Sequence, residues 1–156
     1  MIMILETEVR HGQGRILNSV EGNVIIDWSV QKAMKLALKA AERETNISLT
    51  DKDVIFRIMS DEKETYIIGE SAGVIFALTT IAALTGKKIN ESVVITGTIF
   101  PTGSIGNVTG VKEKIKAAKN IGAELVLVPK GQRIDVEGIK VIEVKDLKEA
   151  GEYIFC

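Results

Sequence analysis

The segment from Ser71 to Thr85, SAGVIFALTTIAALT, constrains the fold of this chain more than any other. Apolar or small side chains occupy nearly every position, so a helix formed here is apolar around its whole circumference. Such a helix is stable in water only where other elements cover it on most sides. Its most apolar part, from Val74 to Leu84, is too short to span a bilayer. We therefore predict a buried core helix over residues 71–85, ended by Gly86.

The remainder of the chain supplies elements that can cover this helix. Period-two and β-branched stretches predict strands, and apolar side chains repeating about every 3.6 residues predict amphipathic helices, the first of them capped by Ser29. The predicted strands are MIMILETEV, NVIIDW, residues 53–60, SVVITGTIF, AELVLVP and IKVIEV, the predicted helices are 29–44, 111–121 and VKDLKEAGEYIF, and PTGSIGNVTG is predicted to be hairpin-like. This mixture predicts a single α+β (mixed α/β) domain over residues 1–156, with two or three layers.

Charge and cysteine content exclude several classes of function. The 20 basic and 21 acidic residues give a formal net charge of −1, which argues against a protein that coats nucleic acid or a membrane surface. The single cysteine leaves no intramolecular disulfide and no cysteine-based zinc site. No charged-then-apolar leader opens the chain. We expect a cytoplasmic protein without nucleic-acid partners, and the wealth of Lys, Glu and Ile leans towards a heat-loving source.

A serine stands where the buried helix is predicted to begin, within Gly69-Glu70-Ser71-Ala72-Gly73. Backbone N–H groups at a helix N-terminus lack intrahelical partners, and the helix dipole adds partial positive charge there. An oxyanion forming at or beside Ser71 would be stabilised by these donors, and the small neighbours leave room for a substrate backbone. Two interpretations stay open at this point: Ser71 caps the helix, or it is a nucleophile.

Three other residues that could carry chemistry receive structural interpretations. A Ser-His-Asp triad would have to use the only histidine, His11, but GESAG is followed by no evident triad, and His11 is expected to lie in a surface turn. Trp28 is expected to anchor the core or its edge rather than to bind a ligand. Cys156 is expected to be exposed and without a catalytic partner.

A serine nucleophile without histidine needs another base, and lysine is the usual substitute. In VKEKIKAAKNI, plotted at about 100° per residue, Lys114 falls within about 30° of the centre of the apolar arc, whereas Lys112, Lys116 and Lys119 lie more than about 100° away. A buried amine is favoured in its neutral form, which lowers its pKa and lets it accept a proton. The alternative is a lysine that extends to solvent or meets a buried carboxylate.

Three blocks, GESAG, VVITGTI and GNVTGVKEKIKAAKNIGAELVLVP, resemble the proteolytic domain of Lon proteases, which are Ser-Lys dyad peptidases. They occur in the family's order and at family-like spacing, and the clear match runs from Ser71 to Pro129. The resemblance implies a ribosomal protein S5 domain 2-like fold. It also implies that Ser71 is the nucleophile and Lys114 the dyad base, the same lysine that the helical wheel selects, while Thr96 lies near that lysine and orients its amine.

The resemblance further implies a serine-type endopeptidase that cleaves unfolded proteins through an acyl-enzyme and needs no cofactor or metal. The backbone N–H groups of Ser71 and Ala72 would hold the oxyanion. An unfolded polypeptide or peptide would lie along an exposed strand edge, for which residues 53–60 and the loop 61–70 are candidates. Homo-oligomerisation into a six-membered ring is implied as well.

The sequence departs from the family pattern in three places. The position three residues before the serine, acidic in many members, is Ile68, and Glu70 is the nearest carboxylate in sequence. No Gly-x4-Gly-Lys-[Ser/Thr] phosphate loop is present, so an ATPase or unfoldase would have to be a partner or a missing domain. Pro101 alters the turn before the lysine helix. The alternative function is a catalytically inactive or partner-activated binding or assembly module, and an ATP-binding small-molecule kinase is disfavoured because no phosphate-cradling motif fits.

Overall fold

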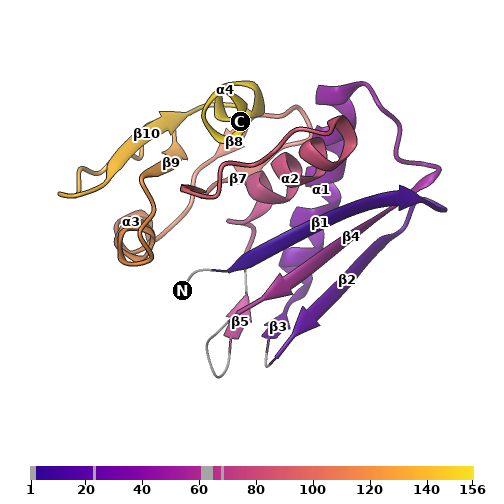
Figure 1. Ribbon diagram of the computed structural model, residues 1–156, viewed down its shortest axis with the longest axis horizontal. Helices are drawn as coiled ribbons and strands as arrows, with labels where there is room; N and C mark the ends of the chain where they lie inside the picture. The colour runs from indigo at the N-terminus through magenta and orange to yellow at the C-terminus, as the bar shows by residue number, and fades with distance from the viewer. Residues whose placement is uncertain (1–2, 23, 61–64, 68) are drawn as a thin grey trace.

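The computed structural model describes residues 3–22, 24–60, 65–67 and 69–156 and confirms a mixed α/β fold (Figure 1). The N-terminal sheet comprises β1 (Ile4–His11), β2 (Ile16–Glu21) and β4 (Lys52–Met59) in the order β1-β4-β2. Strand β1 runs antiparallel to β4, and β2 runs parallel to it. Two short strands, β3 (Val24–Ile26) and β5 (Thr65–Ile67), form a separate parallel pair.

Helices α1 (Trp28–Thr45) and α2 (Gly73–Thr85) lie between the N-terminal sheet and the C-terminal part of the molecule (Figure 1). The prediction that α2 is buried on most sides is confirmed, because its buried residues are Gly73, Val74, Phe76, Ala77, Leu78, Thr80, Ile81 and Ala82, while Ile75 and Thr79 are only partly buried and Ala83 is exposed. The rings of Phe76 and Phe56, which belongs to β4, lie 4.9 Å apart between centroids. The buried Thr80 hydroxyl donates to the Phe76 carbonyl at 2.7 Å, so the polar group on this apolar helix is satisfied within the helix itself.

A second, parallel sheet has the order β10-β9-β6 and consists of β6 (Val93–Ile95), β9 (Leu125–Pro129) and β10 (Lys140–Val144). Helix α4 (Leu147–Ile154) joins the main core with Leu127 of β9. Helix α3 (Val111–Asn120) forms a smaller core with Val126 and Val128 of the same strand. Successive strand residues point to opposite faces, so β9 separates the two cores.

The strand predicted over SVVITGTIF is interrupted. It is split into β6 and β7 (Thr98–Ile99), with Thr96 and Gly97 between them. The following glycine-rich stretch is the predicted hairpin, because β7 pairs antiparallel with β8 (Ile105–Gly106). Pro101 fits this hairpin: it lies in the turn closed by the Gly103 N–H, which donates to the Phe100 carbonyl at 2.9 Å.

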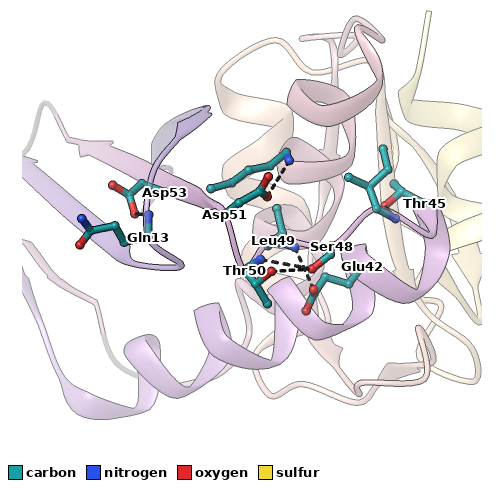
Figure 2. Close-up of polar contacts among 10 residues, drawn as sticks. Gln13, Glu42, Thr45, Ser48, Leu49, Thr50, Asp51 and Asp53 are labelled. Atoms are coloured by element: carbon teal, nitrogen blue, oxygen red, sulfur yellow. Dashed lines mark hydrogen bonds and ion pairs between the residues drawn. The ribbon is translucent and has the colours of Figure 1, made fainter.

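The connection from α1 to β4 is fixed by local polar contacts (Figure 2). The Leu49 N–H donates to Glu42 Oε2 at 2.9 Å, which ties the loop back to α1.

At the start of β4, Asp53 is only 2% exposed, and its Oδ1 accepts hydrogen bonds from the N–H groups of Gln13 and Arg15, each at 3.0 Å. The Arg15 guanidinium pairs with the same carboxylate at 2.7 Å. Asp53 therefore joins the β1–β2 turn to the central strand.

Three sequence-based expectations are wrong. Asp27, not Ser29, caps α1, because its side chain accepts the Ser29 N–H at 3.0 Å. Trp28 is 74% exposed, so it anchors no core; it stands in the first turn of α1, where its side chain points outwards. Residues 53–60 offer no edge for a substrate strand, since β4 is the central strand of its sheet.

Among the residues that the structure describes, no helix is both long and apolar enough to cross a membrane.

Candidate active site

Ser71 lies in the turn just before α2, one residue outside the N-cap position, which Ala72 occupies. No side chain caps the helix by a hydrogen bond, so the interpretation of Ser71 as a helix cap is wrong. The predicted helix start at residue 71 is also two residues early. Within the described part of the chain, the half-buried Ser71 side chain forms no hydrogen bond, which leaves its hydroxyl available to a neighbouring base or a substrate.

The helix starts late because the Ser71 carbonyl is bonded elsewhere. It accepts the Gly97 N–H at 3.0 Å, and the Val74 N–H donates back to the Gly97 carbonyl at 3.2 Å. These two bonds pair the turn before α2 with the bend between β6 and β7. A residue inside a helix would instead direct its carbonyl to the N–H four residues later.

Two glycines permit this close approach. A Cβ atom on Gly73 would lie 2.7 Å from Ile99 Cγ2, and one on Gly97 would lie 2.7 Å from Ile105 Cγ2 and 2.8 Å from Val74 Cγ2. Real Cβ atoms essentially never come so close to another heavy atom. The two glycines therefore set how near the Ser71 turn comes to the strand bend.

Thr96 lies beside the backbone of Ser71. It is 7% exposed, its N–H donates to the Leu127 carbonyl at 3.1 Å, and its hydroxyl reaches the Ser71 carbonyl at 3.5 Å, a distance at which a hydrogen bond is weak. In this structure the hydroxyl thus contacts the backbone of the serine, and within the described part of the chain it forms no hydrogen bond with the Lys114 amine.

Lys114 lies at the end of the first turn of α3, where its N–H donates to the Gly110 carbonyl at 3.1 Å. Its side chain is half-buried, whereas those of Lys112, Lys116 and Lys119 are exposed, as the helical wheel predicted. Desolvation by burial lowers the pKa of the Lys114 amine from its usual 10.5. The positive end of the helix dipole acts in the same direction. In the described part of the chain its ammonium forms no ion pair that would oppose this shift.

Ser71 and Lys114 are held by elements that both contact strand β9. Ser71 is bonded to the bend that follows β6, which pairs with β9, and α3 packs on the other side through Ile115 and Val126. The Ser71 hydroxyl and the Lys114 amine, both in the described part of the chain, form no hydrogen bond with each other. Catalytic hydrogen bonds are often long in the absence of substrate.

Two supports of the site were not found from the sequence. The Gly69 N–H donates to Ser29 Oγ at 2.7 Å, and Lys32 Nζ lies 3.0 Å from Glu70 Oε1. Glu70 therefore pairs with α1. The second support is Gln132, whose side-chain amide accepts the Val108 N–H at 2.9 Å and donates to the Val108 carbonyl at 2.8 Å. Both contacts join residues far apart in the chain, and no local pattern signals them.

The remaining candidates contribute little to this site. His11 is exposed at the end of β1, where it pairs with Lys52, the first residue of β4. Within the described part of the chain, His11 forms no hydrogen bond with Ser71, so the structure gives no support to a triad that uses His11. Ile68, the position that is acidic in many family members, lies outside the described residues, as does the 61–64 part of the loop predicted to bind substrate.

Comparison with known sequences agrees with the resemblance drawn from the three blocks. The family described as the Lon protease (S16) C-terminal proteolytic domain matches residues 1–150. The chain is 32% identical to the archaeal Lon protease of Methanocaldococcus jannaschii over 99% of its own length and 24% of that protein's. It is 29% identical to a Lon protease of Vibrio parahaemolyticus over 94% of its own length and 19% of that protein's. The chain thus spans a quarter or less of the length of these relatives.

Proposed function

Because this chain belongs to the family of Lon protease (S16) C-terminal proteolytic domains, we propose that it is a serine-type endopeptidase with a Ser71–Lys114 dyad. Its substrates are unfolded polypeptides, and it passes through an acyl-enzyme. The observation that carries this proposal is Lys114, a half-buried amine with a lowered pKa on a helix whose other lysines are exposed. An amine held without a compensating anion is suited to take up a proton rather than to stabilise the fold.

The reaction begins when neutral Lys114 removes the proton from the Ser71 hydroxyl. The Ser71 oxygen attacks the peptide carbonyl, and the tetrahedral intermediate collapses to an ester as the protonated Lys114 donates its proton to the departing amine. Lys114, neutral again, takes a proton from water, which attacks the ester. Return of that proton to the Ser71 oxygen releases the second product.

The oxyanion is held by the N–H groups of Ser71 and Ala72. This assignment is supported by the backbone hydrogen bonds: among the described residues, neither N–H donates to a protein acceptor. Both stand at the N-terminal end of α2, where the helix dipole favours negative charge.

A substrate strand needs an edge with unpaired backbone groups, and β5 is the best candidate. It pairs with β3 on one side, and no other described strand pairs with it. Ser71 also follows the last residue of β5, Ile67, by only four positions in the sequence. A polypeptide added to this edge is bound through its main chain, which gives little sequence preference and suits unfolded proteins.

The relatives named above are several times longer than this chain. We propose that an ATPase or unfoldase delivers folded substrates, as a partner subunit or as a further part of the protein, and that copies of the chain assemble into a ring, as the family resemblance implies.

The test uses the purified chain without ATP and reduced casein as an unfolded substrate, with fragments followed by gel electrophoresis and mass spectrometry. Wild-type cleavage that is lost in Ser71→Ala and Lys114→Ala, and kept in Lys116→Ala on the exposed face of the same helix, is the expected result. Cleavage that survives in Ser71→Ala contradicts the dyad.

The second candidate is a module that is inactive alone or activated by a partner. The missing hydrogen bond between Ser71 and Lys114 favours it. Folded wild-type chain that leaves casein intact, but reacts with a serine-directed phosphonate after a partner is added, would support this alternative.

A further inference from the structure

The first turns of α1 contact the two residues that precede Ser71. The Gly69 N–H donates to Ser29 Oγ at 2.7 Å, and Lys32 Nζ lies 3.0 Å from a carboxylate oxygen of Glu70. Ser29 and Gly69 lie 40 positions apart in the sequence. Two successive residues of the loop are thus tied to one end of one helix.

Asp27 fixes the direction of the first tie. Its Oδ1 accepts the Ser29 N–H at 3.0 Å and also accepts the Ser29 hydroxyl. A serine hydroxyl has one proton to donate. Since Asp27 takes that proton, the oxygen lone pairs of Ser29 remain for the Gly69 N–H. Asp27 therefore caps α1 and also makes Ser29 an acceptor towards the loop.

The second tie comes from the same face of α1. Lys32 follows Ser29 by three positions, a spacing that places two side chains next to each other on a helix. Lys32 is about half exposed, and Glu70 is one-third exposed. A partly exposed ion pair of this kind contributes little to the free energy of unfolding of the whole chain. We therefore expect it to act on the position of Glu70.

The tied residues are continuous with the nucleophile. Gly69 has a φ of +88°, which glycine tolerates better than other residues. The Glu70 carbonyl accepts the Gly73 N–H at 3.0 Å. Ser71 is therefore enclosed between the ties to α1 on one side and this turn into α2 on the other.

We propose that Asp27, Ser29 and Lys32 form a latch that holds Gly69 and Glu70 and thereby positions the Ser71 hydroxyl for proton transfer and attack. This inference rests on the proposed function, in which Ser71 is the nucleophile. The three latch residues are positioning residues. Without the latch, Gly69 and Glu70 are free to move, and the Ser71 hydroxyl spends less time within reach of Lys114 and the substrate carbonyl.

The main test compares Ser29→Ala with Ser92→Ala. Ser92 is a matched control, because its N–H and hydroxyl donate to Asn90 Oδ1 at 3.0 and 2.6 Å, the same local arrangement as Ser29 with Asp27. Ser29→Ala retains the N–H that Asp27 accepts, so the cap of α1 is preserved and the melting temperature should resemble that of the control. Ser29→Thr keeps a hydroxyl and should restore activity.

We expect Ser29→Ala to lower kcat for an unfolded peptide by about tenfold or more with a much smaller change in KM, since small misplacements of reacting groups are costly. Equal kcat values for Ser29→Ala and Ser92→Ala would overturn the latch. So would a loss in Ser29→Ala that Ser29→Thr does not restore.

The ion pair is tested by exchanging its charges. Lys32→Glu should lower kcat, and the double variant Lys32→Glu with Glu70→Lys should regain part of it. A double variant no better than the product of its two single variants would exclude the second tie.

Hydrogen exchange separates the latch from the proposed function. The Gly69 amide should exchange slowly in the wild type and rapidly in Ser29→Ala, whether or not the chain cleaves casein. A wild type that is inert but shows this protection overturns the proposed function and leaves the latch as a structural tie. An active wild type with an unprotected Gly69 amide overturns the latch alone.

Discussion

The carbonyl oxygen of Ser71 accepts a hydrogen bond of 3.0 Å from the backbone N–H of Gly97. This bond joins the turn that carries the candidate nucleophile to the bend between β6 and β7. The position of Ser71 is consequently set by the backbone of a distant strand as well as by α2.

Gly97→Ala should impair folding stability and activity together. The added methyl group would overlap Ile105 and Val74, each less than 3.0 Å from the new Cβ. Overpacking of this kind costs about 1–3 kcal/mol, and relief requires the strand bend to move away from Ser71. Urea unfolding and casein cleavage measure the two effects. Gly151→Ala in α4 is the control, because there the new methyl group meets only the half-buried ring of Phe155. If Gly151→Ala lost as much stability and activity as Gly97→Ala, overpacking at the strand bend would not be the cause.

The rate of cleavage should rise with pH through the pKa of Lys114. Burial lowers that pKa below 10.5, so the neutral amine, which is the proposed base, becomes populated at a lower pH than in an exposed lysine. A profile of kcat/KM against pH should therefore show an ascending limb with its midpoint below 10.5.

Replacement of Lys114, the proposed dyad base, is the control for this profile. Lys114→Arg keeps a charge that cannot be released at these pH values, and activity should fall at least about a thousandfold at every pH. An ascending limb that persists in the residual activity of Lys114→Arg would assign the titration to another group.

Gln132→Ala should loosen the entry to α3. The Gln132 amide makes two hydrogen bonds to the Val108 backbone, three residues before the helix begins. Their loss should reduce the free energy of unfolding by about 1 kcal/mol and lower kcat several-fold through Lys114. Arg133→Ala removes a neighbouring exposed side chain that pairs, among the described residues, with Asp135 alone and should leave both quantities unchanged. Equal effects of the two substitutions would argue against a specific role for Gln132.

Asp53 should make the stability of the chain depend on acid pH. The Arg15 guanidinium, followed by the N–H groups bonded to the carboxylate, holds the pKa of Asp53 well below its usual 3.8. A lowered pKa in the folded state means that the stabilisation is complete above pH 3.8 and is lost as the pH falls from there through the folded-state value.

Asp53→Asn should therefore melt at a lower temperature than the wild type at neutral pH, and the gap should narrow below pH 4. Asp135→Asn, a substitution of an exposed carboxylate, is the control and should leave the melting temperature close to that of the wild type. A gap for Asp53→Asn that stays constant with pH would show that the ion pair is not its cause.

The sequence predicted those features that depend on local periodicity. The apolar circumference of α2 and the inward face of α3 at Lys114 follow from side-chain spacing alone, and both are confirmed. The glycine-rich hairpin between β7 and β8 follows from turn chemistry. The three sequence blocks also suffice to indicate the family, which matches over residues 1–150.

Features that depend on strand order could not be predicted in this way. The stretch from Ile16 to Glu21 has no distinctive alternation, yet it pairs with β4 and makes that strand central. This pairing removed the substrate edge expected at residues 53–60. The latch at Ser29 and the hydrogen bonds of Gln132 to Val108 could not be predicted for the same reason, since each depends on a partner remote in sequence.

The position of strand β9 between two apolar clusters affects how the protein loses its structure on heating. Its two faces belong to different apolar clusters, and the smaller one, built from Val111, Ile115, Ala118, Val126, Val128 and Val141, packs α3, the helix that carries Lys114, against β9. A small cluster can open as a cooperative unit at lower free energy than the whole molecule. The proposed dyad therefore straddles two units of unequal stability. Catalysis should be lost, reversibly, at temperatures where most of the molecule is still native.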